Sequence, residues 1–280
     1  MDYESNKHVL NLQLKFNVVR RLKHIFAFMY KKIEKNNSDI IYGFHALKEA
    51  IQSGKEINKI LIQKGIQKDR FDELKTLLSG NSYTLQYVPV QKLNSITQQN
   101  HQGIIAFTPP IEYHNIEELV DTWIEAEEVK SVLVLDRITD VRNFGAIART
   151  AECMGIEAIL IPSSGSALVT SDAMRASSGA LSRIKVCKTN DLKNSLFYMQ
   201  QSGYRIITVT EKAKVPVYEI NLRGSIAIVM GSEKDGVSKD LINLSDISIK
   251  IPMEGQVSSL NVGVATGMVL YERDRQLNKD

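Results

Sequence analysis

Cysteine is scarce in this chain, and long apolar runs are absent. The 280 residues include two cysteines, Cys153 and Cys187, which lie far apart in the sequence and form no CxxC pair. Neither a disulfide framework nor a cysteine-based zinc site can be built from them, so a reducing compartment fits best. No stretch approaches 18 consecutive apolar residues, and the mean hydropathy is −0.16. A transmembrane helix is therefore excluded, and the sequence predicts a soluble protein of the cytoplasm.

Signatures of several common enzyme classes are also missing. The sequence has no GxGxxG after an early strand, no GxxxxGK[ST], no HExxH and no GxSxG. These absences weaken the dinucleotide-binding, nucleoside triphosphatase, metalloprotease and hydrolase interpretations. The five histidines share no metal-ligand spacing, so we expect no metal site.

Positive charge is concentrated at the N-terminus. The net charge is +3, yet the first 35 residues contain eight Lys or Arg against three acids, so the remainder sums to −2. The stretch 10–35 mixes apolar and basic residues and predicts an appended amphipathic helix within a basic extension, residues 1–38. We favour a solvated extension, while an RNA-binding arm and a transit peptide remain open interpretations.

Beyond the extension, the pattern indicates two α/β units. Residues 39–110 alternate short helical and strand patterns, and Pro109-Pro110 then suits a linker. In residues 115–280, apolar runs such as VLVLD, AILIP and IAIVMG predict strands that are buried on both faces. Such strands are typical of a mostly parallel sheet covered by helices.

The last predicted helix carries a regular apolar stripe. The pattern predicts a helix over residues 260–275, and four residues at helical spacing share one face: Leu260, Val264, Met268 and Tyr271. We expect this stripe to pack on the parallel sheet.

Polar and glycine residues follow three of the predicted strands. Ligands of open α/β sheets bind at the carboxyl ends of the strands, so these segments mark a candidate site. Taken alone, each has a structural explanation, such as a helix cap at Asn143, a surface arginine at Arg149 or a tight turn at Gly231. Their joint occurrence along one sheet favours a catalytic site. The candidate residues of these segments are, in chain order, Asn143, Gly145, Arg149, Gly231, Glu233, Ile251, Ser259, Leu260 and Asn261.

These three segments resemble motifs one, two and three of the SpoU, or TrmH-like, class of RNA ribose 2′-O-methyltransferases within the SPOUT superfamily. Segments 41–46 (IYGFHA) and 101–106 (HQGIIA) resemble the start and end of that family's accessory substrate-binding domain. The pairing points to members that methylate a guanosine in large-subunit ribosomal RNA. The resemblance implies an accessory RNA-binding domain over residues 39–110 and a catalytic domain with a trefoil knot over residues 115–280. It also implies S-adenosylmethionine as the cofactor and a homodimer with each active site near the interface.

The resemblance also implies roles for single residues. Five residues match catalytic positions of the three motifs: Asn143, Arg149, Glu233, Ser259 and Asn261. Three more match positions whose backbone contacts the cofactor: Gly231, Ile251 and Leu260. One departure is Gly263, which stands where many members have serine, so no hydroxyl contact is implied at that position.

The expected reaction aligns a ribose 2′-hydroxyl with the sulfonium methyl group and must remove a proton from a very weak acid. Arg149 is the family's favoured activator, but a guanidinium with a pKa above about 12 is a poor proton acceptor. We therefore assign Arg149 to positioning phosphate and stabilising the developing alkoxide. Glu233 is an alternative proton acceptor, or else it orients Arg149 or Asn143, and the sequence leaves these roles open.

Two alternatives accompany the enzyme hypothesis. The first is a tRNA ribose methyltransferase of the same class, and the second is a knotted RNA-binding protein that has lost methyl transfer. The joint presence of the five catalytic positions favours an enzyme, because a protein that only binds RNA has no physical need for all of them.

Overall fold

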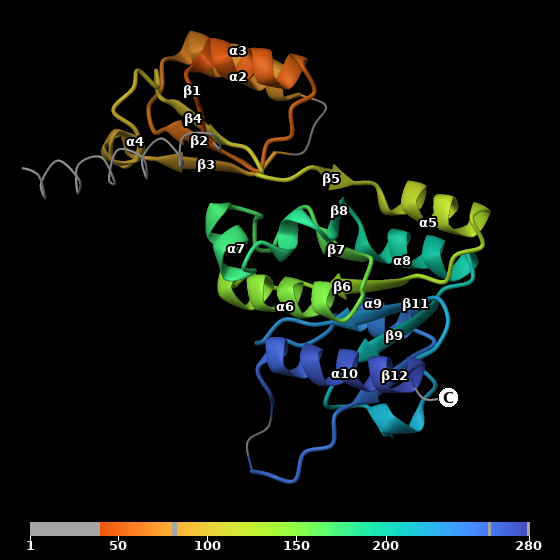
Figure 1. Cartoon of the computed structure of the whole chain (residues 1–280). Coiled ribbons are helices and arrows are strands. Elements are labelled where there is room, and N and C mark those ends of the chain that lie inside the picture. Colours follow the sequence, from red (N-terminus) through yellow and green to blue (C-terminus); the bar gives the residue numbers. More distant parts are fainter. Residues whose placement is uncertain (1–39, 80–82, 257–258, 279–280) are drawn as a thin grey trace, which may run out of the picture.

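The computed structural model describes residues 40–79, 83–256 and 259–278. The predicted basic extension, residues 1–38, lies outside this range. The chain forms two α/β units that follow each other along the sequence (Figure 1). In the described part of the chain, no helix is long and apolar enough to cross a membrane. The same residues contain no group of three or more His, Cys, Asp or Glu side chains that could hold a metal ion.

The N-terminal unit is a four-stranded mixed sheet in the order β1-β4-β2-β3. Its strands are β1 (Ile40–Tyr42), β2 (Lys59–Gln63), β3 (Leu85–Val88) and β4 (Ile104–Phe107). Its helices are α2 (Phe44–Gln52), α3 (Lys68–Leu78) and α4 (Val90–Ile96). The first two pack Leu47 and Leu74 against one face of the sheet, and α4 packs Leu93 against the other. Both faces of this small sheet are therefore covered.

The C-terminal unit is built on an eight-stranded sheet in the order β10-β12-β9-β11-β6-β7-β8-β5, and every strand pair in it is parallel. The central strands are buried along their whole length, as the apolar runs predicted, so the α/β fold class is confirmed. The trefoil knot stays a prediction. The strands are β5 (Tyr113–His114), β6 (Ser131–Leu135), β7 (Ala158–Pro162), β8 (Lys185–Thr189), β9 (Arg205–Val209), β10 (Val215–Pro216), β11 (Ile226–Met230) and β12 (Ile247–Lys250).

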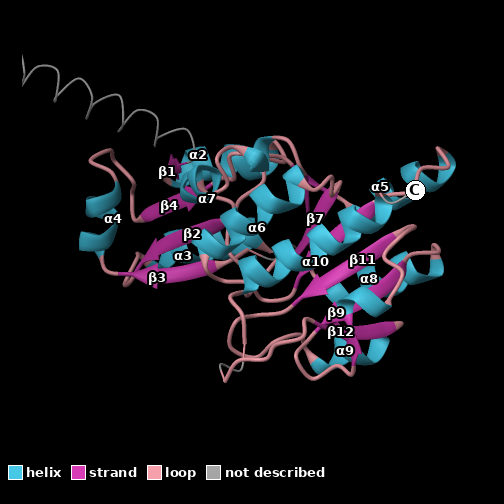
Figure 2. Ribbon diagram, turned by 60° about the horizontal axis from the view of Figure 1, so that its bottom comes forward, coloured by secondary structure: helices cyan, strands magenta, loops and turns pink. Residues whose placement is uncertain are grey.

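Helices cover both faces of the parallel sheet (Figure 2). One face packs against α6 (Val141–Cys153), α7 (Ser171–Ala176) and α10 (Val262–Leu277). The other face packs against α5 (Ile116–Glu125), α8 (Leu192–Gln201) and α9 (Lys239–Leu244). Because all the strands of this sheet run the same way, their carboxyl ends meet at one edge, where a ligand can reach residues from several loops.

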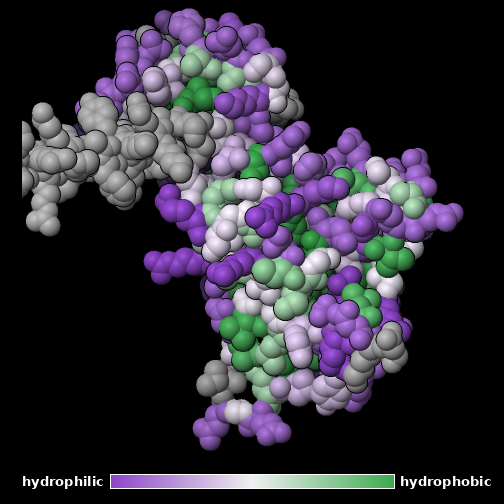
Figure 3. Space-filling view, in the orientation of Figure 1, coloured by the Kyte–Doolittle hydropathy of each residue, from purple (hydrophilic) through white to green (hydrophobic). Residues whose placement is uncertain are grey.

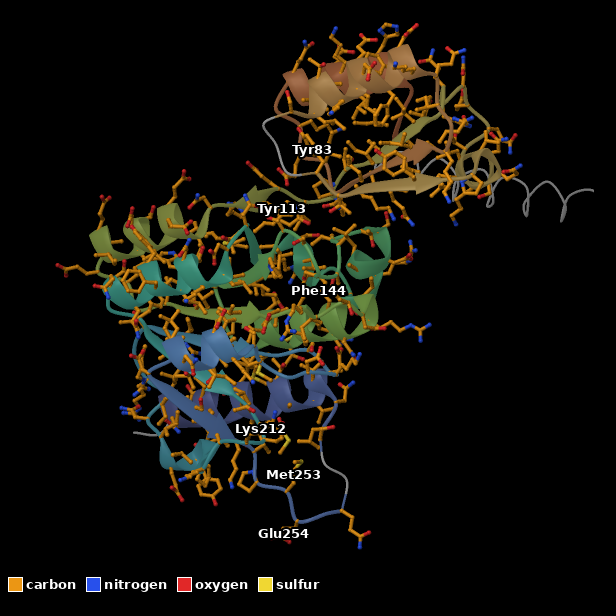
Figure 4. The ribbon with its side chains drawn as sticks, turned by 180° about the vertical axis from the view of Figure 1, so that it is seen from behind. Tyr83, Tyr113, Phe144, Lys212, Met253 and Glu254 are labelled. Carbon is orange, nitrogen blue, oxygen red and sulfur yellow. The ribbon has the colours of Figure 1, made fainter. Side chains whose placement is uncertain are left out.

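A buried asparagine joins the two units. Asn58 of the N-terminal unit is 2% exposed and donates its side-chain Nδ2 to the backbone carbonyl of Val169, at 2.8 Å. The hydroxyl of Tyr113 donates to Asn58 Oδ1 at 3.1 Å, and Figure 4 shows Tyr113 at this junction. Burial raises the pKa of the Tyr113 phenol well above its ordinary value, so it stays a hydrogen-bond donor. The N-terminal unit is thus held against the C-terminal unit by specific polar contacts.

The expected packing of the last helix is wrong. The four residues predicted to face the sheet are exposed: Leu260, just before α10, is 40% exposed, and Val264, Met268 and Tyr271 on α10 are 54%, 45% and 60% exposed. A second set of residues at similar helical spacing is buried instead: Val262, Thr266, Val269, Leu270 and Arg273. Apolar residues lie around most of this helix, so its period alone does not say which face is inside. The three exposed residues on α10, Val264, Met268 and Tyr271, are called the apolar stripe below. Figure 3 shows patches of hydrophobic side chains on the surface of the C-terminal unit.

The two cysteines differ in environment. Cys187 in β8 is buried, and burial raises the pKa of its thiol to about 12. Cys153, at the end of α6, is exposed because the helix ends at the surface. Both thiols are free.

We expect a maleimide reagent to modify one thiol in the native protein at neutral pH. The thiolate is the reactive form, so exposed Cys153 should react while buried Cys187 reacts only after unfolding. Mass spectrometry of the labelled peptides measures this directly. Rapid native labelling of Cys187 would contradict the burial of β8.

Candidate active site

A cleft of about 510 Å³ lies at the carboxyl ends of β9, β11 and β12. These strands, together with β6, are consecutive in the sheet. Five of the predicted site residues line the cleft, namely Gly231, Glu233, Ile251, Ser259 and Leu260. The strand-end argument from sequence therefore identified one wall of a real cavity.

Gly231 is required by a close approach of two backbone segments. A Cβ placed on Gly231 would lie 2.1 Å from both the carbonyl carbon of Gly236 and the amide nitrogen of Val237. The loop between them is closed by Ser232, whose amide donates to the Gly236 carbonyl at 3.2 Å, and by a return bond of 2.9 Å from the Gly236 amide. Residues 231–237, called the glycine loop below, thus form a tight turn along the cleft.

Three predicted catalytic side chains form one hydrogen-bonded group, called the amide cluster below. Asn143 Nδ2 donates to Glu233 Oε1 at 2.5 Å, and Asn261 Nδ2 donates to Asn143 Oδ1 at 3.1 Å. These residues are 90 and 118 positions apart in sequence, and they come from α6, the glycine loop and the start of α10. The structure therefore brings all three predicted motifs together at the cleft.

The caps of the two helices explain how the cluster is oriented. A helix cap at Asn143 was the structural alternative to a catalytic role, but Asp140 caps α6 and accepts from the amides of Arg142 and Asn143 at 2.8 and 2.9 Å. Asn143 lies one turn inside α6, where its side chain is available to Glu233. Asn261 caps α10 through Oδ1, which accepts from Gly263 N at 2.9 Å, and this leaves its Nδ2 to donate to Asn143.

Arg149 is not part of the amide cluster within this chain. It is exposed on α6, and its Nη1 donates to the hydroxyl of Ser178 at 3.3 Å. This contact directs the guanidinium toward the turn after α7. Arg149 neighbours Thr150, whose methyl group would lie 3.8 Å from a Cβ placed on Gly267 of α10. It therefore lies close to the helix that carries the apolar stripe.

The sequence analysis missed the wall of the cleft that follows β9. Glu211 and Lys212 line it there, and Met253 lines it after β12. Figure 4 shows Lys212 and Met253 at the same end of the molecule, beside the loop that carries Glu254. The strand-end rule could have found Glu211 and Lys212, because they directly follow an apolar run. With Glu233 and Asp235, they give the cleft a mixed charge beside apolar walls.

Known proteins share both units of this chain. The SpoU rRNA Methylase family matches residues 130–271, and a domain family described as RNA 2′-O ribose methyltransferase substrate binding matches residues 40–114. A relative from Staphylococcus saprophyticus, named as a TrmH family tRNA/rRNA methyltransferase, is 36% identical over 239 residues, which cover 85% of this chain and 96% of the relative.

Solved structures agree with this similarity. The structure of an AdoMet-bound rRNA methyltransferase from Sinorhizobium meliloti has a TM-score of 0.56 at 20% identity, and the match covers 86% of this chain and 88% of that one. The structure of an RNA 2′-O ribose methyltransferase has a TM-score of 0.51 at 25% identity, with 85% and 88% covered. At 20% identity, the similarity to the S. meliloti methyltransferase shows a shared fold.

Proposed function

We propose a target RNA for this chain, which belongs to the SpoU rRNA Methylase family and carries a substrate-binding domain before its catalytic domain. The chain is an RNA ribose 2′-O-methyltransferase. Its target is a guanosine ribose in large-subunit ribosomal RNA. The observation that carries the proposal is the amide cluster, which joins the three catalytic motifs at the mouth of one cleft.

The cleft fits S-adenosylmethionine, which supplies an activated methyl group on a sulfonium. Its volume of about 510 Å³ lies within the range of small-molecule sites, roughly 300–1,000 Å³. Met230, Ile251 and Leu260 provide an apolar wall for an adenine ring, and Glu211 and Asp235 add negative charge. The S. meliloti methyltransferase of similar fold holds AdoMet. Gly231, Ile251 and Leu260 are the residues that we assign to backbone contacts with the cofactor.

The chain's own residues position the ribose and stabilise charge. The short bond from Asn143 to Glu233 supports an orienting role for Glu233, because the carboxylate fixes the amide whose oxygen is held by Asn261. Ser259, exposed at the rim of the cleft, adds a hydroxyl for the RNA. Arg149 positions a phosphate and stabilises the alkoxide as it forms. RNA substrates and two free thiols suit a location in the cytoplasm.

The functional unit in this proposal is a homodimer that pairs through the apolar stripe. Three large apolar side chains exposed along a single helix face are unfavourable in water, and a second copy would cover them. The stripe also adjoins Arg149, since α10 packs on α6 through Gly263 and Gly267. Pairing on this face would place Arg149 near the interface and away from its own cleft.

We expect Met268→Glu to convert the protein to a monomer at micromolar concentration. A carboxylate in the middle of the apolar stripe would have to be buried without a partner, which opposes pairing. Light scattering on purified protein measures the mass. Phe197→Glu, which changes an exposed apolar residue on α8, on the other face of the sheet from α10, is the matched control and should stay dimeric. A monomeric wild type, or a dimeric Met268→Glu, would contradict the proposed interface.

The target assignment is tested by mapping ribose methylation in RNA from a strain that lacks the gene. We expect one guanosine of large-subunit ribosomal RNA to lose its 2′-O-methyl group, and purified protein with S-adenosylmethionine to restore it. Loss of a methyl group from tRNA instead would favour the tRNA alternative. Tight RNA binding without any transfer would favour the knotted RNA-binding protein.

A further inference from the structure

The glycine loop is anchored by an acidic residue that belongs to a different loop. Asp136 directly follows β6 and is 3% exposed. Its Oδ2 accepts a hydrogen bond of 2.7 Å from the backbone amide of Ser238, 102 positions later, just beyond the glycine loop. A buried carboxylate with a backbone donor holds that backbone firmly, because moving it would leave the carboxylate unpaired.

The next residue completes the anchor. Arg137 donates Nε to Asp136 Oδ1 at 2.9 Å and Nη2 to Asp136 Oδ2 at 3.1 Å, which is a bidentate pair between adjacent residues. The same Nη2 donates to the carbonyl of Gly236 at 3.1 Å, and Nη1 lies 3.8 Å from a carboxylate oxygen of Asp235. The two residues therefore grip the glycine loop on both sides of Val237, at Gly236 O and Ser238 N.

The backbone of Arg137 is unusual in a way that serves this contact. Its φ is +60°, in the left-handed region that non-glycine residues rarely occupy. This conformation curls the chain so that a side chain can pair with the carboxylate of the preceding residue. A strained backbone that persists beside the glycine loop, where glycine would be easier, indicates that the arginine side chain has a task there.

Gly231 packs against the part of the glycine loop that Asp136 and Arg137 anchor. The Gly236 carbonyl accepts from both Arg137 and Ser232, and Gly231 lies against the backbone of Gly236 and Val237. The same loop presents Glu233 to Asn143. Fixing Gly236 therefore fixes the cofactor wall and the carboxylate of the amide cluster together.

We propose that Asp136 and Arg137 form a clamp that holds the glycine loop ready for the cofactor, so that both act as positioning residues for methyl transfer. The proposal rests on the proposed function, since it takes the cleft to be the S-adenosylmethionine site. Without the clamp, the loop must be ordered when the cofactor binds, and that ordering weakens affinity. The affinity for RNA depends on other surfaces and is unaffected.

Two substitutions at Arg137 separate positioning from stability. Arg137→Ala removes the guanidinium and keeps a side chain in the left-handed backbone. Arg137→Gly removes the guanidinium and relieves the backbone, so it should have a higher melting temperature than Arg137→Ala. We expect both variants to bind S-adenosylhomocysteine about tenfold more weakly and to show a raised KM for S-adenosylmethionine, with the KM for RNA unchanged. Arg137→Lys should rescue poorly, because an ammonium cannot make the bidentate pair.

The control lies at the opposite end of the same strand. Lys130, just before β6, pairs with Glu128 and Glu157 at 3.4 and 3.8 Å, so Lys130→Ala removes an ion pair far from the cleft. Calorimetry on the full-length protein measures affinity, and hydrogen exchange should show faster exchange confined to the glycine loop. Affinity of folded Arg137→Gly within twofold of wild type would overturn the clamp. Failure of the wild type itself to bind S-adenosylhomocysteine would overturn the proposed function instead.

Discussion

Replacing Gly231 by alanine is expected to weaken binding of S-adenosylhomocysteine by at least about 100-fold. The added methyl group would lie 2.1 Å from backbone atoms of Gly236 and Val237, and a backbone cannot rotate away as a flexible side chain can. The glycine loop must then move, which shifts both the cleft wall and Glu233. Titration calorimetry on the purified variant measures the affinity, and circular dichroism shows that the fold is retained.

The same region supplies a matched control for Gly231. Gly255 lies after β12, and nothing lies within 4 Å of a Cβ placed on it. Gly255→Ala should therefore bind the cofactor product as the wild type does. A folded Gly231→Ala protein with affinity within twofold of wild type would show that the glycine loop does not form part of the cofactor site.

The buried strands were predictable because burial on both faces leaves a continuous apolar run. This holds for β6, β7 and β11, and the residues that follow such strands led to Gly231 and Glu233. Short strands leave no such signal. The strands β5 and β10 have two residues each and pair at the edges of the sheet, where little is buried. Their two-residue patterns do not differ from those of loops.

Other features depend on contacts that a one-dimensional pattern does not hold. Asp140 and Asn143 are both good helix caps, and the choice between them was settled by Glu233, 90 residues away, which pairs with Asn143. The inward face of α10 includes Arg273, which is 7% exposed and donates to the hydroxyl of Ser131, 142 positions away, at 2.7 Å. In both cases local propensity allowed two answers, and a long-range contact selected one.

Arg149→Ala is expected to reduce single-turnover methyl transfer by about 10²-fold while leaving cofactor affinity within twofold of wild type. The side chain does not line the cleft, so no cofactor contact is lost. It lies beside the face proposed for pairing, where it can reach RNA held near the interface. Removing one group that stabilises charge in a transition state has an effect of this size. Quenched-flow assays at saturating RNA and S-adenosylmethionine measure the step.

Two further variants separate this role from a structural one. Ser178→Ala removes the hydroxyl that Arg149 contacts at 3.3 Å and should leave transfer nearly normal, because the contact orients the guanidinium without supplying its charge. Arg183→Ala removes another exposed arginine, which pairs with Glu152 at 3.7 Å, and tests for a general loss of positive charge. Arg149→Lys should rescue poorly, because a point charge on a flexible stem does not reproduce the planar fork. Equal transfer rates for the wild type and Arg149→Ala would make Arg149 a surface residue of α6 and remove it from the reaction.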